Sequence, residues 1–261
     1  MAVSDELLET QAGTQDNLTP IEQHNNYWVK RDDLFEVAGI RGGKARTCWH
    51  LAQGATGLVT AGSRSSPQVN IVAHMAAELG IECRCHVPSG KLSPELEAAK
   101  DIGAEIIQHK PGYNSVIIAR ARTDAEQRNW REIPFGMECE EAVKQTASQV
   151  KNLPAAIRRI VVPVGSGMSL SGVLQGLIDE KIDIPVLGVV VGADPRRRLN
   201  KYAPSNWEAM CELVESGIPY SQETRVEFPI RLDPIYESKC VQFLEGGDLL
   251  WIVGIRESSL T

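Results

Sequence analysis

Six short runs rich in apolar and β-branched residues recur along the chain, and stretches with helical spacing of apolar residues separate them. The expected strands are residues 57–60, 82–87, 105–108, 159–164, 186–191 and 249–253. Strands that are apolar on both faces are typical of parallel sheets covered by helices on each side. The sequence therefore predicts an α/β fold with parallel-rich sheets flanked by helices.

Two helix starts and one irregular segment are also readable. Ser93 before Pro94 predicts a helix start, and Ser205 with Glu208 three residues later has the spacing of a capping box. Several prolines interrupt the pattern within residues 195–233, so we expect loops there.

Charge and the first residues limit the class of protein. The formal net charge of −7 gives no overall electrostatic reason to bind nucleic acid, so we expect a small-molecule substrate. The first 18 residues lack the apolar core of a secretory signal, and no apolar run approaches the ~20 residues needed to cross a bilayer. Because six cysteines occur without such a signal, we expect reduced thiols, a cytoplasmic location and no membrane partner.

A lysine lies in a glycine-rich turn at the start of an expected helix. Gly42 and Gly43 let the backbone turn tightly, and Lys44 begins a helical pattern that runs to Gln53. A lysine held there can be desolvated, which lowers its pKa and favours imine formation. A solvated lysine is the commoner finding, so this motif alone defines no site. A P-loop is disfavoured because Ala45 stands where Ser or Thr is required.

A second loop, rich in glycine and serine, follows the expected strand 159–164. It comprises Gly165, Ser166, Gly167, Met168 and Ser169. Backbone N–H groups of such a loop, at the positive end of a helix, bind anions such as phosphate. A dinucleotide site is disfavoured because Leu170 stands where the third glycine would be. A plain tight turn stays open as the alternative.

Four segments in this order resemble one family. They are Lys30 to Leu34 (KRDDL) before Lys44, Thr60 to Gln68 (TAGSRSSPQ), the loop at 165–169, and Leu232 to Lys239 (LDPIYESK). The chain resembles pyridoxal 5'-phosphate (PLP) dependent enzymes of the tryptophan synthase β-like fold (fold type II). Within them it is similar to the branch of 1-aminocyclopropane-1-carboxylate deaminase and D-cysteine desulfhydrase. The resemblance spans about residues 28–254.

The resemblance implies a two-domain fold with PLP bound between the domains. We expect a larger, cofactor-binding domain from residues 1–48 and 145–261, and a smaller domain from residues 49–144 that contributes the substrate-carboxylate loop. Lys44 resembles the lysine that forms the Schiff base and moves protons, and the loop at 165–169 resembles the phosphate cradle. A homodimer is expected.

Further residues take roles from the resemblance. Ser65, Ser66 and Gln68 correspond to places that face the substrate carboxylate, and Ser66 belongs to the implied catalytic set with Lys44. Pro67 replaces an asparagine that helps to hold the ring hydroxyl of the cofactor. That contact is therefore absent or supplied by another group, such as Gln68.

Two residues of the late acidic segment complete the implied site. Tyr236 resembles a catalytic tyrosine beside the ring, and Glu237 resembles the carboxylate that meets the pyridine nitrogen. A carboxylate there keeps the ring protonated, so that the cofactor withdraws electrons strongly. An exposed helical glutamate is the alternative for Glu237.

These implications predict a lyase of the deaminase or desulfhydrase type that acts on an amino acid through an external aldimine and a stabilised carbanion. Two alternatives stay open: the same chemistry on an amino acid attached to a larger group such as a modified nucleobase, or a non-catalytic PLP-binding protein. We expect no metal site. Cys83 and Cys85 share one face of their strand while His86 points away, and no second ligand pair matches them.

Overall fold

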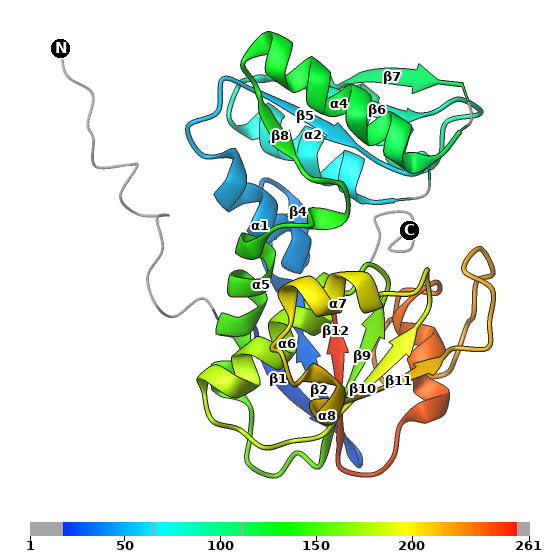
Figure 1. The fold of residues 1–261 in the computed structure, drawn as a ribbon. Coiled ribbons are helices and arrows are strands. Elements are labelled where there is room, and N and C mark those ends of the chain that lie inside the picture. The colour runs from blue at the N-terminus through cyan, green and yellow to red at the C-terminus, as the bar shows by residue number, and fades with distance from the viewer. Residues whose placement is uncertain (1–17, 65, 111, 255–261) are drawn as a thin grey trace, which may run out of the picture.

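The computed structural model describes residues 18–64, 66–110 and 112–254, which form two large sheets, with helix α1 (Gly43–Ala52) between them, and a small hairpin (Figure 1). The larger sheet has the strand order β1-β2-β12-β9-β10-β11. Its strands are β1 (Ile21–His24), β2 (Tyr27–Arg31), β9 (Arg159–Val164), β10 (Val186–Val190), β11 (Cys211–Glu215) and β12 (Asp248–Ile252). Every pairing in it is parallel except that of β1 with β2.

The smaller sheet has the order β7-β6-β5-β8 and is parallel throughout. Its strands are β5 (Gly57–Ala61), β6 (Glu82–Pro88), β7 (Glu105–His109) and β8 (Arg131–Ile133), and a separate hairpin pairs β3 (Glu36–Val37) with β4 (Ile40–Arg41). The remaining α-helices are α2 (Gln68–Glu78), α3 (Pro94–Asp101), α4 (Asn114–Arg128), α5 (Glu140–Ala147), α6 (Met168–Asp179), α7 (Arg196–Tyr202) and α8 (Trp207–Met210).

The side-chain alternation of β9 fills two cores. Val162 and Val164 pack in the core that α6 covers, while Val161 faces the opposite core. A 3-10 helix, η5 (Glu237–Phe243), covers that second core through Cys240. Successive strand residues point to opposite faces, so a strand covered on both sides is apolar at every position.

The smaller sheet is built in the same way. Leu58 of β5 packs in the core that contains α2, whereas Val59 packs against Ala121 and Ala125 of α4. Both sheets thus have helical layers on both faces, as the continuous apolar runs predict.

All six expected strands form, each within one residue of its expected ends. The strands that the sequence pattern did not reveal are short or carry charged residues, such as β8 with three residues and β11 with the sequence CELVE. Hydrogen bonding to neighbouring strands, rather than apolar content, places them in the sheets.

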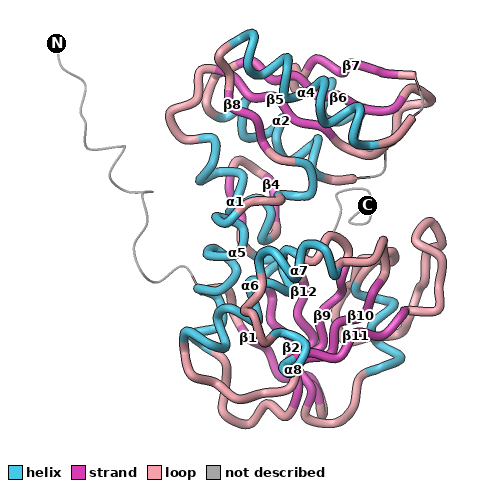
Figure 2. The backbone as a smooth tube through the Cα atoms, viewed as in Figure 1, coloured by secondary structure: helices cyan, strands magenta, loops and turns pink. Residues whose placement is uncertain are grey.

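The expected helix starts have different outcomes. The Ser93 hydroxyl accepts a hydrogen bond from the Leu96 N–H at 3.4 Å, which confirms the start of α3. The capping box at Ser205 is wrong, because Asn206 is the N-cap of α8 and this four-residue helix has no side-chain cap. The expectation that residues 195–233 form loops is wrong up to Glu215, because α7, α8 and β11 occupy much of this part. The chain continues as a loop after β11 (Figure 2).

The cysteines and histidine of strand β6 lie on opposite faces, as expected. The sulfur atoms of Cys83 and Cys85 are 3.6 Å apart in the core beside α2, while His86 faces Asp124 of α4. Among the described residues, no group of three or more His, Cys, Asp or Glu side chains could hold a metal ion, and no helix is long and apolar enough to span a membrane.

A polar cluster fixes α4 on the smaller sheet. His86 is buried, with Nε2 2.9 Å from Asp124 Oδ2 and Nδ1 2.8 Å from His109 Nε2. Arg84 and Arg128 donate to the same Asp124 carboxylate at 2.6 and 3.0 Å. Burial raises the pKa of Asp124, but these hydrogen bonds outweigh it and lower the pKa to about 2.

We expect Asp124→Asn to lower the free energy of unfolding by about 2 kcal/mol at pH 7, because a depressed carboxyl pKa is a gain in folded-state stability. That gain is present above the unfolded pKa and is lost as the pH falls from about 4 towards about 2. Urea unfolding at pH 7 and pH 3 measures it, with exposed Glu126→Gln on the same helix as control. A difference from wild type that is as large at pH 3 as at pH 7 would contradict the electrostatic account.

Candidate active site

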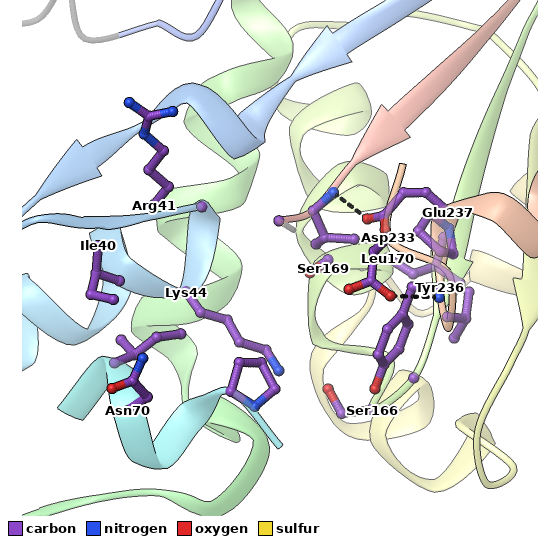
Figure 3. Close-up of a pocket in the computed structure, with 18 of the residues that line it drawn as sticks. Ile40, Arg41, Lys44, Asn70, Ser166, Ser169, Leu170, Asp233, Tyr236 and Glu237 are labelled. Atoms are coloured by element: carbon purple, nitrogen blue, oxygen red, sulfur yellow. Dashed lines mark hydrogen bonds between the residues drawn. The ribbon is translucent and has the colours of Figure 1, made fainter. Parts of the chain in front are cut away.

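A cleft opens at the carboxyl ends of β9 and β12, which are neighbours in the larger sheet. Gly165 follows β9 and Val253 follows β12, and both line the cleft. The facing wall carries Lys44 from the start of α1 and Asn70 from the start of α2 (Figure 3). Ligand sites of α/β proteins form at this end of parallel strands, since loops there converge from several strands.

Lys44 is the second residue of α1, and its side chain extends across the cleft toward Ser166 and Tyr236 (Figure 3). The turn before it packs tightly against the chain after β12, where the Gly43 N–H donates to the Val253 carbonyl at 3.1 Å. Gly42 adopts φ +105°, and a Cβ at Gly43 would clash with the Asp32 carboxylate. Both glycines are therefore required for the position of Lys44.

The KRDDL segment (residues 30–34) packs against this turn through Asp32. Asp32 is 1% exposed and accepts hydrogen bonds from the Arg46 guanidinium at 2.5 Å and from the Thr19 hydroxyl at 3.3 Å. Lys30 is fully buried, and its Nζ donates to the Thr19 carbonyl and to Asn152 Oδ1 at 2.8 and 2.7 Å. Neither Asp32 nor Lys30 lines the cleft.

The glycine and serine loop forms the opposite wall. Gly165, Ser166, Gly167 and Ser169 line the cleft, whereas the Met168 side chain is buried in the core beside α1 and α2. Helix α6 begins at Met168, so backbone N–H groups without intrahelical partners lie at this place.

The geometry of this loop also requires glycine. A Cβ at Gly165 would lie 2.8 Å from Cε1 of Tyr236, and Gly167 adopts φ +91° with Pro195 close to its open side. Side chains at these positions would therefore displace the neighbours or occupy the space beside the N–H groups.

Glu237 is the first residue of η5 and is completely buried. Its Oε1 accepts a hydrogen bond from the Val253 N–H at 3.0 Å, while Oε2 has no partner among residues 18–64, 66–110 and 112–254. Burial, followed by the negative charges of Asp233 and Asp33, raises the pKa of Glu237 well above its ordinary value. The raised pKa favours the neutral form of this side chain. Glu237 lines the cleft and is not exposed at the outer surface.

The segment before Glu237 orients a tyrosine pair. Asp233 Oδ1 accepts hydrogen bonds from the Ile235 and Tyr236 N–H groups at 2.8 and 3.1 Å. The hydroxyls of Tyr236 and Tyr220 are 3.2 Å apart, and their rings meet edge to face with centroids 5.9 Å apart. No sequence pattern singled out Tyr220, because it lies in the loop after β11.

The substrate-carboxylate loop differs from its predicted arrangement. Gln68 is 1% exposed and lies outside the cleft wall. Its amide nitrogen donates to Thr60 Oγ1 and the Pro134 carbonyl at 3.0 and 2.8 Å, and its oxygen accepts from the Gly136 N–H at 2.7 Å. Both donor hydrogens of the Gln68 amide are therefore used within the fold, and a role of this side chain towards the substrate stays a prediction.

The other residues of this loop are placed as follows. The Ser66 hydroxyl accepts a hydrogen bond from the Gln68 N–H at 3.3 Å and does not line the cleft, whereas Pro67 does. Ser65 lies outside the described residues. Asn70, which the sequence pattern did not single out, also lines the cleft.

Residues 4–225 match the family described as pyridoxal-phosphate dependent enzyme. No curated protein matches the chain.

Solved structures with a similar fold include an ACC deaminase homologue, with a TM-score of 0.77 and 21% sequence identity over 93% of this chain and 90% of that one. Threonine deaminase isoform 2 from Solanum lycopersicum has a TM-score of 0.64 and 14% identity, over 93% and 81% of the two chains. Maize serine racemase has a TM-score of 0.62 and 14% identity, over 91% and 88%. At these identities the likeness shows a shared fold.

Proposed function

Because the chain belongs to the family of pyridoxal-phosphate dependent enzymes, we propose that it is a deaminase-type lyase that acts on a small amino acid in the cleft around Lys44. Two predictions are confirmed by this membership and the shared fold: the α/β, tryptophan synthase β-like architecture and PLP as the cofactor. The similar structures include both deaminases and racemases, so the choice of reaction rests on the residues of the cleft.

The buried carboxyl of Glu237 carries the proposal. Its Oε2 is buried without a hydrogen-bond partner in the described part of the chain, and a pyridine nitrogen is a group that would satisfy it. Because burial raises the pKa of this carboxyl, a proton on Oε2 would be shared with that nitrogen. PLP, when bound, withdraws electrons from the reacting carbon, most strongly with its ring nitrogen protonated. Strong electron withdrawal by the ring favours loss of a substituent from the substrate as well as loss of a proton.

The other residues of the cleft fit the remaining parts of PLP. The Lys44 amine extends into the cleft, where it would bind the aldehyde carbon and take up or return a proton at the substrate. Backbone N–H groups of residues 165–169 would hold the phosphate. The Tyr236 hydroxyl, beside that of Tyr220, would hold a proton near the reacting carbon or the leaving group.

The two sheets support the proposed domain division. The larger sheet comes from residues 21–31 and 159–252, and the smaller from residues 57–133. We propose domain boundaries at 48/49 and 144/145, with the cleft between the two parts.

A panel of free amino acids tests the reaction. A deaminase-type lyase releases ammonia and a 2-oxo acid, whereas a racemase inverts the substrate and releases neither. Turnover only of aminoacyl-nucleosides would support the alternative with an attached amino acid. Bound cofactor without α-proton exchange on any substrate would indicate a PLP-binding protein that has no catalytic activity.

We expect Gly165→Val to weaken PLP binding by about 10- to 100-fold, because crowding of this kind costs about 1–3 kcal/mol and the new side chain would meet Tyr236. Gly246→Ala is the control, since its Cβ would meet nothing closer than 3.9 Å. Fluorescence titration with PLP measures both. Equal affinity in Gly165→Val and wild type would place the phosphate elsewhere.

A further inference from the structure

Asn70 carries a buried amide oxygen that the protein itself does not satisfy. The residue is the third of α2, is 2% exposed and lines the cleft. Its Oδ1 accepts no hydrogen bond from any residue that the structure describes. A buried acceptor without a partner costs stability, so its presence in a ligand cleft points to a ligand group that uses it.

The neighbours of Asn70 on this wall offer no substitute. Pro67 and Ile71 also line the cleft from the start of α2, and neither side chain has a hydrogen-bonding group. The amide of Gln68 is engaged by Thr60, Pro134 and Gly136. Asn70 is thus the polar side chain that α2 presents to the cleft.

The chemistry of PLP indicates which of its groups lies there. The ring nitrogen is opposite the aldehyde carbon, and the phosphate arm and the ring hydroxyl are attached on opposite sides of the line that joins them. Glu237 and the loop at 165–169 are on one side of the cleft, while Lys44 and Asn70 are on the other (Figure 3). A ring anchored by nitrogen, aldehyde and phosphate therefore turns its hydroxyl away from the phosphate loop, towards the wall formed by α2.

We propose that the Asn70 carboxamide binds the ring oxygen of the cofactor beside the Schiff base, an assignment that rests on the proposed site. An amide suits this oxygen in both protonation states: Oδ1 accepts from a hydroxyl and, after rotation of the amide, Nδ2 donates to the ionised oxygen. Asn70 therefore positions the ring and sets the proton affinity of the neighbouring Schiff base.

Two variants test the assignment. We expect Asn70→Leu to bind PLP about 10-fold more weakly, and Asn70→Asp to bind it more weakly still, because a carboxylate repels the ionised ring oxygen. The visible absorption band should titrate with pH at a higher apparent pKa in Asn70→Asp than in wild type. Asn114→Leu, at the exposed start of α4, serves as the matched control with wild-type values.

Stability without cofactor separates ligand binding from a structural role. Because Oδ1 has no protein partner in the described structure, PLP-free Asn70→Leu should unfold at the same urea concentration as wild type or a higher one. A clear loss of stability would show that the amide serves the fold and would overturn the proposal. So would wild-type PLP affinity and an unshifted titration in both variants. If wild type forms no Schiff base that Lys44→Ala removes, the proposed site itself fails.

Discussion

Lys44→Ala is expected to lose the visible Schiff-base band and all measurable turnover, while it keeps the wild-type fold. Among the described residues that line the cleft, Lys44 is the only lysine. Burial lowers the pKa of Lys30 to about 8, but its Nζ donates to Thr19 and Asn152 away from the cleft. Lys239 is likewise buried, with its Nζ bound to the carbonyls of the loop after β11. Neither can replace Lys44 without rearrangement of the fold.

Absorption spectra after incubation with PLP, together with turnover assays, measure this loss. Lys100→Ala on the exposed side of α3 is the control and should keep the band and the rate. Circular dichroism establishes that the Lys44 variant is folded. A Schiff-base band of wild-type intensity in Lys44→Ala would refute the assignment.

Glu237→Gln is expected to bind PLP and to lower turnover by about 10- to 1000-fold, which corresponds to about 1.4–4 kcal/mol of lost transition-state stabilisation. Glutamine keeps most of the shape and can accept the hydrogen bond from the Val253 N–H, but its amide can only donate a hydrogen bond to the ring nitrogen and cannot transfer a proton to it. Steady-state rates and spectra measure the effect. Exposed Glu227→Gln is the control, and wild-type rates in Glu237→Gln would show that another group meets the ring nitrogen.

The raised pKa of Glu237 also predicts a pH-dependent difference in stability between the cofactor-free wild type and Glu237→Gln. Because the folded pKa of Glu237 is raised, its contribution to stability is present below the unfolded pKa and is lost as the pH rises through the folded value. Glutamine does not titrate, so PLP-free Glu237→Gln should be more stable than wild type at pH 8, and this advantage should shrink towards pH 4. An advantage independent of pH would argue against a buried, titrating carboxyl.

The strands and two walls of the cleft could be predicted because their signals are local. A continuous apolar run such as β9 reports burial on both faces. Gly42 and Gly167 report tight backbone turns, and Gly165 reports the close approach of the Tyr236 ring. Tyr236 and Glu237, which the resemblance singled out, both line the cleft. Short strands such as β8 carry no such signal, since their place depends on partners distant in sequence.

The wall formed by α2 could not be predicted from motif positions. Successive residues of a helix are turned by about 100°, so Pro67, Asn70 and Ile71 share one face while Gln68 is directed elsewhere. The sequence alone leaves open where α2 begins, and a shift of one residue would exchange these roles. The unsatisfied amide of Asn70 is likewise visible only once its surroundings are known.

Peptide mapping after borohydride reduction tests the central claim most directly. Reduction of the PLP-loaded protein converts the Schiff base into a stable secondary amine, and mass spectrometry then locates the modified lysine. We expect one stoichiometric adduct on Lys44 and none on Lys30 or Lys239. An adduct on another lysine, or no adduct in protein that binds PLP tightly, would contradict an enzyme built around Lys44.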